Sequence, residues 1–481
     1  MLMKKIFLSA VFYGLAPLAH LSAQTFTLNN YSDTNINWSS AEIWSVSGEG
    51  SQTFPQDGGN VVLSNESQSV NQTLVVDDSY KIDSLNVSMN GDGAHWSFSV
   101  NAGKTLEIAE DSVVDASFNW YQLMICGAGS YDFKKNLTLK GDIGGGKRAT
   151  ITFGNSSSSR QLSSLNVGGN LSITNDSAVD MNVYFNVAEV NIAGALNIAP
   201  KSKVVLARST NSANGAVSSF SLGGINGSGA LRLGFDSASY YGRKSVANVT
   251  ISGEGGSWSG TFDKMTTNAD SRFNLTMDGR GTQDFKVSSA TFVDGATNSN
   301  IIDTLTVNNG VFNYGAGDYV SGSLVLNGGK FSAASLIDSG ISEDVGAARF
   351  ESGLWNGGAI VFDIWTAGAN FDKIEFSGLF DKGDGDMSLE FRFDAEGMAE
   401  LVEMGLSAFE DMIVYASGSS IEGTVLNGVS NGFAWEAVFG ETGMDVTFAA
   451  IPEPAVIAAL FGLSALLFAA FRGERKRGGW A

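Results

Sequence analysis

The stretch Lys81-Ile-Asp-Ser-Leu-Asn-Val-Ser88 places Leu85 and Val87 on one side and Ser84, Asn86 and Ser88 on the other, which is the pattern of a half-buried β-strand. The same alternation recurs in four further segments: Lys104-Thr-Leu-Glu-Ile108, Asn136-Leu-Thr-Leu139, Ala195-Leu-Asn-Ile198 and Thr304-Leu-Thr-Val307. Turns rich in glycine, asparagine and aspartate separate these segments. The pattern predicts an all-β protein.

The alternating segments recur at loose intervals of about 20 to 30 residues, as the coils of a solenoid do. Glycine and asparagine at the segment ends supply the left-handed turn conformations that such coils need. We predict a right-handed parallel β-helix-like solenoid over residues 24–348. A flattened array of β-sandwiches is the alternative arrangement for the same pattern.

The sequence changes character near Arg349. Phe350–Phe376 carries aromatic-rich strands, and Met387–Phe393 alternates cleanly. In residues 395–411 the apolar side chains have near-helical spacing, and they are Met398, Leu401, Val402, Leu406 and Phe409. We therefore predict that residues 349–449 form a small β-rich terminal module with one helix, which caps the solenoid.

The composition argues against a disordered chain and against nucleic-acid binding. Hydrophobic residues make up 43% of the 481 residues, which is enough for an extended core. The formal net charge is −21, and the basic residues at the two ends make the part between them more acidic still. Such a surface repels the phosphates of nucleic acids and of anionic lipids.

Few residues are suited to metal binding or nucleophilic catalysis. The single cysteine, Cys126, excludes an intramolecular disulfide and a zinc site of several thiolates, and we expect it to be a buried apolar residue. The two histidines are His20 and His95, so a Ser-His-Asp triad in the mature protein would need His95. We predict no metal and no cofactor.

The N-terminal residues have the features of a secretory signal peptide. Lys4 and Lys5 precede an apolar stretch from Ile6 to Leu18, and small residues follow. Such a segment is removed on export, and we place the cleavage between Ala23 and Gln24.

The C-terminal residues predict a membrane helix. The apolar stretch Ala455–Phe471 is followed by a basic cluster made of Arg472, Arg475, Lys476 and Arg477. At about 1.5 Å per residue the stretch spans about 25 Å, just enough for the hydrocarbon core. The basic cluster stays in the cytoplasm, so the body lies on the far side of the membrane.

Pro452-Glu453-Pro454, the following apolar stretch and the basic cluster together resemble the PEP-CTERM sorting signal of Gram-negative bacteria. The resemblance covers about thirty residues in the order that this signal has. It implies recognition by an exosortase, a membrane protease, with removal of the tail and delivery to the cell envelope or the exopolysaccharide matrix. A permanent single-span anchor is the alternative.

Two glycine-rich stretches of the body, residues 221–233 and 251–260, resemble the β-helix units of autotransporter passengers. The run from Asn37 to Leu63 resembles the opening cap of such passengers. The resemblance implies a β-helix scaffold and does not specify a ligand.

Two segments resemble ligand-binding motifs, but each lacks a feature that the motif requires. Residues 141–148 match a phosphate-binding loop up to Arg148, but strands flank them instead of a helix, so we expect a hairpin turn. The segment Asp381–Asp386 resembles a calcium loop, but Arg392 occupies the position where such a loop has glutamate. We expect a solvated turn there and retain a weak calcium site as the alternative.

Neither acids nor aromatics form an obvious active site. The acids of the predicted solenoid are scattered singly, as at Asp83, Glu107, Asp115, Asp142 and Asp180. Five aromatics suit either a sugar-binding platform or, as we expect, core packing, and they are Trp38, Trp44, Trp96, Trp120 and Tyr121.

The sequence therefore predicts an exported, non-catalytic surface or extracellular-matrix protein with a structural or adhesive role. Its predicted partners are an exosortase-type protease, the membrane through the C-terminal helix, and exopolysaccharide or other surface glycans. A carbohydrate-active enzyme or a carbohydrate-binding protein on a β-helix scaffold is the alternative, since β-helices host many functions.

Overall fold

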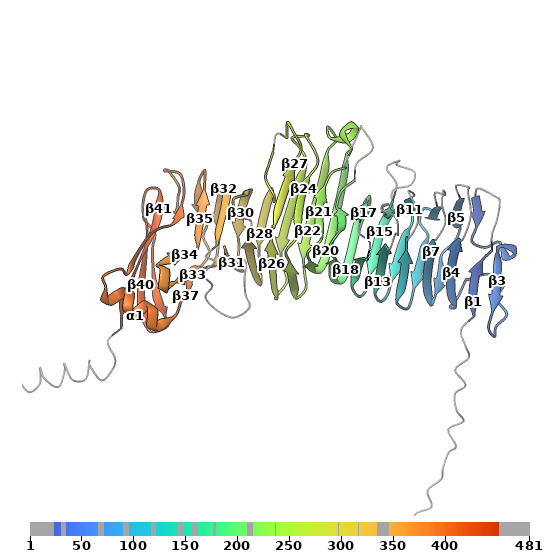
Figure 1. The fold of residues 1–481 in the computed structure, drawn as a ribbon, viewed down its shortest axis with the longest axis horizontal. Helices are drawn as coiled ribbons and strands as arrows, with labels where there is room; N and C mark the ends of the chain where they lie inside the picture. Colours follow the sequence, from blue (N-terminus) through green and yellow to red (C-terminus); the bar gives the residue numbers. More distant parts are fainter. Residues whose placement is uncertain are drawn as a thin grey trace, which may run out of the picture.

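The computed structural model describes residues 24–451 except 30–34, 66–71, 90–95, 117–121, 142–148, 155–161, 177–178, 209–214, 236, 297, 316 and 334–345. These residues form an elongated stack of coils (Figure 1). Residues 60–392 are a parallel β-solenoid of about 10 turns, followed by a C-terminal β module with one short helix. The predicted solenoid is confirmed, and the parallel pairing excludes the sandwich array.

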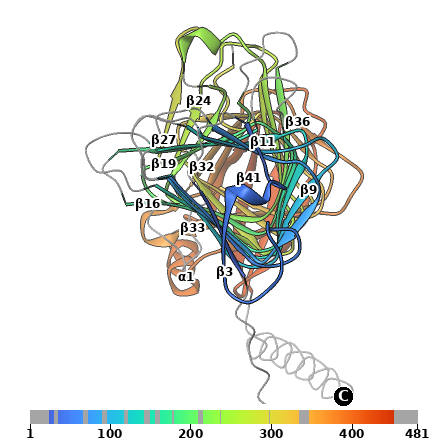
Figure 2. The same ribbon diagram turned by 90° about the vertical axis from the view of Figure 1, so that its right-hand side faces the viewer.

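Each complete coil crosses three parallel ladders of strands, which enclose a common core when seen along the stack (Figure 2). Ladder 1 consists of β4 (Asn60–Asn65), β7 (Ser84–Met89), β10 (Ser112–Asp115), β13 (Leu137–Gly141), β16 (Leu171–Asn175), β23 (Gly255–Trp258), β26 (Thr282–Lys286), β29 (Val311–Gly315), β31 (Lys330–Ser332), β33 (Gly358–Trp365) and β37 (Met387–Arg392).

Ladder 2 consists of β6 (Tyr80–Ile82), β9 (Thr105–Ile108), β12 (Ser130–Phe133), β15 (Leu162–Val167), β22 (Ser245–Ile251), β25 (Arg272–Met277), β28 (Thr304–Val307), β30 (Val320–Leu326), β32 (Ala347–Trp355), β35 (Lys373–Phe376) and β36 (Phe380–Lys382). Two long strands run through the corner and belong to both ladders: β18 (Val187–Ile198) and β20 (Ala216–Gly227).

Ladder 3 is a separate sheet made of β2 (Asn35–Asn37), β5 (Gln72–Val76), β8 (Trp96–Val100), β11 (Gln122–Gly127), β14 (Thr150–Phe153), β17 (Met181–Phe185), β19 (Ser202–Val205), β21 (Ala230–Leu233), β24 (Thr261–Lys264) and β27 (Ser289–Phe292). Successive side chains of a strand point to opposite faces, so every second residue faces the core and the residues between them face out.

The core is built from like residues stacked in register from coil to coil. In ladder 2 one inward column runs through nine coils, all of its residues buried: Leu106, Tyr131, Leu165, Val190, Phe220, Val249, Leu275, Leu305 and Leu324. The alternation at Leu305 and Val307 that is visible in the sequence is therefore the inward face of this ladder.

The corner between ladders 2 and 1 is too tight for side chains in its middle coils. A Cβ on Gly279 would lie 2.0 Å from the carbonyl oxygen of Gly253, and the same conflict recurs along a column made of Gly194, Gly223, Gly253, Gly279 and Gly310. In the coils nearer the N-terminus, asparagine residues occupy this corner and bond to the backbone of the next coil. The Asn136 side-chain oxygen accepts from the Asn170 backbone N–H at 2.8 Å, and Asn170 accepts from Ala195 at 2.8 Å.

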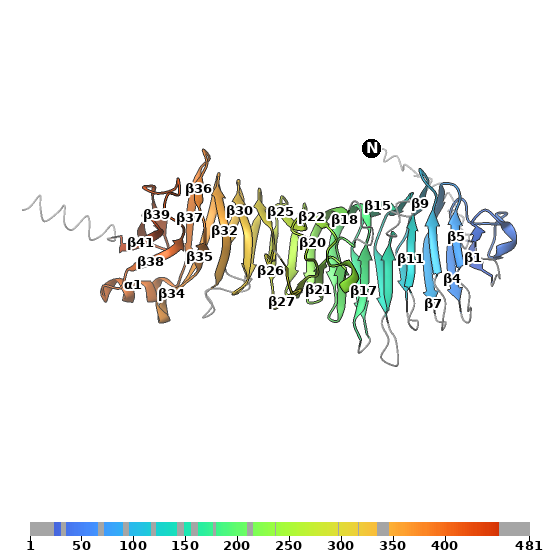
Figure 3. The same cartoon turned by 90° about the horizontal axis from the view of Figure 1, so that it is seen from above.

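The two ends of the stack differ (Figure 3). At the N-terminal end β1 (Thr25–Leu28) pairs in parallel with β4 and antiparallel with β3 (Trp44–Ser47), which η1 (Ala41–Ile43) precedes. At the other end α1 (Ala395–Glu403) precedes the strands β38 (Ala408–Val414), β39 (Val425–Ser430), β40 (Phe433–Phe439) and β41 (Gly443–Ala450), whose mutual pairing is antiparallel. The remaining short elements are η2 (Ala238–Tyr240), η3 (Thr366–Gly368) and β34 (Asn370–Phe371).

Two predicted boundaries need correction. The parallel ladders continue through β37 to Arg392, so the coils do not stop at residue 348. The helix ends at Glu403 instead of continuing to residue 411. Asp394 caps its start by accepting from the Gly397 N–H at 2.7 Å, and Gly405, with φ of +74°, ends it. Of the five predicted helix residues, Leu406 lies in the connection and Phe409 in β38.

The predicted membrane helix 455–471 and the signal peptide 1–23 lie outside the described residues. Among residues that the structure describes, no helix has the length and apolar character needed to cross a membrane.

We predict that Gly279→Ala lowers the free energy of unfolding by about 1–3 kcal/mol, because the added methyl group forces the coils apart at the corner. The control is Gly242→Ala, where a Cβ meets no atom within 4 Å and we expect a change within about 0.5 kcal/mol. Thermal unfolding of the two variants measures the difference, and equal midpoints would contradict the tight corner.

Candidate functional site

Most of the predicted sorting residues lie outside the described residues. They are Ala23, Pro452, Glu453, Pro454, Arg472, Arg475, Lys476 and Arg477. Gln24, the predicted first residue of the mature chain, is described, and its side-chain oxygen accepts from the Gln52 N–H at 3.4 Å.

The two apparent ligand loops join strands. Gly141 ends β13 and Thr150 begins β14, which confirms that strands flank residues 142–148, themselves outside the described part of the chain. The expected hairpin is wrong, because β13 belongs to ladder 1 and β14 to ladder 3 and the two strands do not pair with each other. The calcium-like segment comprises the end of β36 and the turn that leads to β37. Its first carboxylate, Asp381, accepts from the Ser420 N–H at 2.9 Å.

The described aromatics of the predicted platform pack in the core. Trp38, Trp44 and Trp96 are all buried, and the rings of Trp38 and Trp44 meet edge to face with centroids 5.0 Å apart. This confirms core packing for these three, while Trp120 and Tyr121 lie outside the described residues. Cys126 is buried as predicted.

Two of the singly scattered acids form ion pairs on the solenoid surface. Glu107 lies between Lys81 at 3.2 Å and Lys134 at 3.5 Å, and these lysines lower the pKa of its carboxyl group. Asp180 pairs with Lys203 at 2.8 Å. Within the described ranges no three His, Cys, Asp or Glu side chains are grouped to hold a metal ion.

A buried ionic cluster lies where ladders 2 and 3 meet. Lys264 and Asp303 are almost fully buried, and the Lys264 Nζ lies 3.0 Å from Asp303 Oδ2. Lys264 Nζ also donates to the Asn300 carbonyl at 3.2 Å. Burial lowers the pKa of Lys264 below its ordinary value, and the Asp303 carboxylate opposes that shift.

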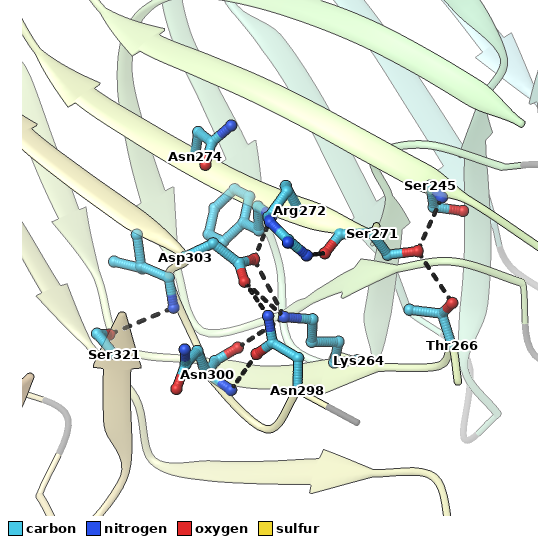
Figure 4. Close-up of polar contacts among 12 residues, drawn as sticks. Ser245, Lys264, Thr266, Ser271, Arg272, Asn274, Asn298, Asn300, Asp303 and Ser321 are labelled. Carbon is cyan, nitrogen blue, oxygen red and sulfur yellow. Dashed lines mark hydrogen bonds and ion pairs between the residues drawn. The ribbon is translucent and has the colours of Figure 1, made fainter. Parts of the chain in front are cut away.

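Asp303 holds the segment that precedes β28. Its carboxylate accepts from the Phe273 backbone N–H at 2.6 Å and from the Asn298 side-chain amide. Asn298 in turn accepts from the Asn300 N–H at 2.9 Å. Figure 4 shows these groups converging beside Arg272, so one buried pair fixes two amide-bearing residues in place.

A cleft of about 610 Å³ opens next to this cluster. Its lining combines one guanidinium, two carboxylates, two amides and two rings, from Arg272, Asp318, Glu351, Asn298, Asn300, Phe292 and Tyr319; Ala269, Ser299 and Val320 complete it. Both rings are half-buried against the core. Its volume falls within the roughly 300–1,000 Å³ of small-ligand sites.

The cleft lies at a step in the solenoid. Within the described residues ladder 3 has no strand after β27, and the chain passes from β29 to β30 through residues 316–319 alone. Leu305 and Leu324, paired neighbours in ladder 2, are therefore only 19 residues apart, against 30 for the preceding pair, Leu275 and Leu305. The profile of the stack drops beyond β24 and β27 (Figure 1).

Sequence reasoning missed this cleft and its cluster. Lys264 ends a strand of ladder 3 and Asp303, 39 residues later, directly precedes β28 of ladder 2, so no local motif links them. The detectable signal was the short spacing between the Leu305 and Leu324 segments, which leaves too little chain for a third strand.

A second ionic cluster, in which the two carboxylates are buried and Arg392 is partly exposed, lies nearer the C-terminal module. Arg392 contacts Asp363 through two nitrogens, at 2.6 and 2.9 Å. Asp372 accepts from the backbone N–H groups of Gly346 at 2.6 Å and Asp363 at 2.8 Å. Burial raises the pKa of Asp372 to about 7 despite these hydrogen bonds, and burial also raises the pKa of Asp363.

The fold thus defines the chain as a parallel β-solenoid protein with a polar cleft at a step in its coils. No family model, no curated protein and no solved structure matches the chain.

We predict that Lys264→Met lowers the free energy of unfolding by about 3–5 kcal/mol, because it leaves the Asp303 carboxylate buried without its cation. The matched control is Lys203→Met, which breaks the more exposed pair with Asp180 and should cost less than about 1 kcal/mol. Denaturant unfolding measures both, and a similar small loss in the two variants would contradict the role given to Lys264.

We predict that Asp372 makes the protein less stable as pH rises. Its pKa is near 4 when the chain is unfolded and about 7 when it is folded, so the folded state favours the protonated form. Stability from this group is complete below pH 4, falls as pH rises through about 7, and is constant above that. Thermal unfolding of the wild type and Asp372→Asn from pH 4 to 8 isolates the effect. Curves that differ by a constant across this range would contradict it.

Proposed function

We propose that the chain is an exported surface or extracellular-matrix protein with a structural or adhesive role. The observation that carries the proposal is the parallel solenoid of residues 60–392, which is an extended scaffold with a continuous apolar core. A solenoid of this kind presents long outer surfaces while each coil is supported by its neighbours.

The outer surface of ladder 2 supports the same role. Its outward column is composed of short polar side chains and one carboxylate, in register from coil to coil: Ser130, Ser164, Glu189, Ser219, Asn248, Asn274, Thr304, Ser323 and Ser352. Amides in adjacent coils bond to one another, as Asn274 does to Asn248 at 2.9 Å. Such a surface stays hydrated and suits contact with hydroxyl-rich polymers.

The terminal segments support the proposed export of the chain and its sorting to the cell surface. The basic and apolar N-terminus is typical of a secretory signal, and Pro452-Glu453-Pro454 with the apolar stretch and the basic end resembles a PEP-CTERM signal. In this proposal an exosortase-type protease removes the tail, and the right-handed, passenger-like solenoid reaches the envelope surface or the matrix.

A carbohydrate-active enzyme is the second candidate. The cleft brings Asp318 and Glu351 to one site, and paired carboxylates are the catalytic groups of most glycoside hydrolases. Arg349 lies 2.7 Å from Asp318 and forms an ion pair with it at the rim of the cleft.

The C-terminal peptide of the mature protein tests the sorting proposal. We expect mass spectrometry of protein from envelope and medium to find chains that end near Pro454, without residues 455–481. A chain that retains Ala481 in the membrane fraction, with none released, would overturn processing and leave a permanent anchor.

A further inference from the structure

The cleft at the step has polar groups that the protein does not use. Within the described part of the chain, the side chains of Asn300, Tyr319 and Glu351 make no hydrogen bond or ion pair with other residues. Arg272 donates through a single nitrogen, Nη1, to the carbonyl groups of Ala269 and Ser271, which leaves its other N–H groups for a ligand. Donors and acceptors therefore both face the same space.

The two amide-bearing residues of the lining are held in place before any ligand arrives. Asn298 and Asn300 belong to the segment that the buried Lys264–Asp303 pair secures, whereas Asp318 forms an exposed ion pair with Arg349. Arg349 is itself anchored by Glu375 at 2.9 Å. A preorganised site binds more tightly because little conformational entropy is lost on binding.

The lining discriminates between classes of ligand. Asp318 and Glu351, on a chain with a net charge of −21, repel phosphates, sulfates and uronic acids. The charged and amide groups disfavour a purely apolar molecule, because such a ligand would desolvate them without replacing their hydrogen bonds. A simple cation would leave the Arg272 guanidinium facing it.

A neutral sugar meets all of these conditions. Each of its hydroxyl groups donates and accepts at once, which matches a lining of carboxylates, amides and a guanidinium. Its ring also has an apolar face of C–H groups that packs on aromatic rings, and Phe292 and Tyr319 supply two partly exposed rings.

We propose that this cleft binds a short segment of a neutral polysaccharide, with Tyr319 packing against a sugar ring and with Asn300, Arg272 and Glu351 bonding its hydroxyls. The inference rests on the proposed surface or matrix role and gives that role a ligand class. It also explains why the coil is shortened here, since a full third strand after β27 would fill the cleft.

The test uses the full-length chain in mild detergent and measures binding by calorimetry to defined hexasaccharides. Cellohexaose, laminarihexaose and mannohexaose are the neutral probes, hexagalacturonate is the anionic probe and the chitosan hexamer is the cationic probe. We expect binding to at least one neutral probe and none to hexagalacturonate.

Two substitutions locate the site. Tyr319→Ala and Glu351→Gln should each weaken binding of that neutral probe at least tenfold, while Tyr319→Phe, which keeps the ring, should retain most of it. The matched control is Glu436→Gln, another exposed strand glutamate outside the cleft, with an expected change below twofold. Thermal unfolding of each variant verifies that it is folded.

The outcomes separate this inference from the proposed function. Absence of neutral binding, preference for a charged probe, or unchanged affinity in both cleft variants would overturn the inference while a processed C-terminus still supports export to the surface. Release of shorter sugars that Glu351→Gln abolishes would support the ligand class and overturn the non-catalytic role. Neutral binding in this assay, together with an unprocessed tail in the protein isolated from envelope and medium, would support the cleft and overturn the sorting.

Discussion

The parallel hydrogen-bond ladder between successive coils is the constraint on which the rest of this structure depends. Strands in such a ladder are about 4.8 Å apart, so each residue must tolerate its counterpart in the next coil at that distance. Apolar residues satisfy the condition by stacking inward, and amides satisfy it outside by bonding to one another, as Asn327 does to Asn356 at 2.7 Å. At the corner of the middle coils only glycine fits, and Gly279 above Gly253 is the tightest example in that column.

Local alternation was sufficient to predict the strands and the solenoid, because Leu305 and Val307 face the core whatever the coil length. The end of the solenoid was misplaced, because the aromatic residues near Phe350 changed the composition without interrupting the ladders. The predicted helix was too long, because the spacing of apolar residues does not reveal the left-handed turn at Gly405 that ends it. The cleft was invisible to pattern reasoning, since Lys264 and Asp303 meet only through the coil geometry.

The step and the buried ion pair are connected. In the described part of the chain, no ladder 3 strand follows β27 to pair with its free edge. Lys264, in the preceding strand β24, holds the segment before β28 through directed polar contacts to Asp303 and the Asn300 carbonyl. A buried charge pair is seldom the most stabilising choice, but its fixed directions position nearby polar groups in a way that apolar packing does not.

Each coil is bonded mainly to the coil before and the coil after it, so the coil is the unit by which the stack separates under force. The ladder hydrogen bonds lie along the long axis, so a pull applied at the two ends loads every coil interface, and the interfaces then separate one after another. A protein held at one end and attached to a polymer elsewhere would then lengthen in steps under tension, and the shortened coil between Leu305 and Leu324 marks the place where the steps change size.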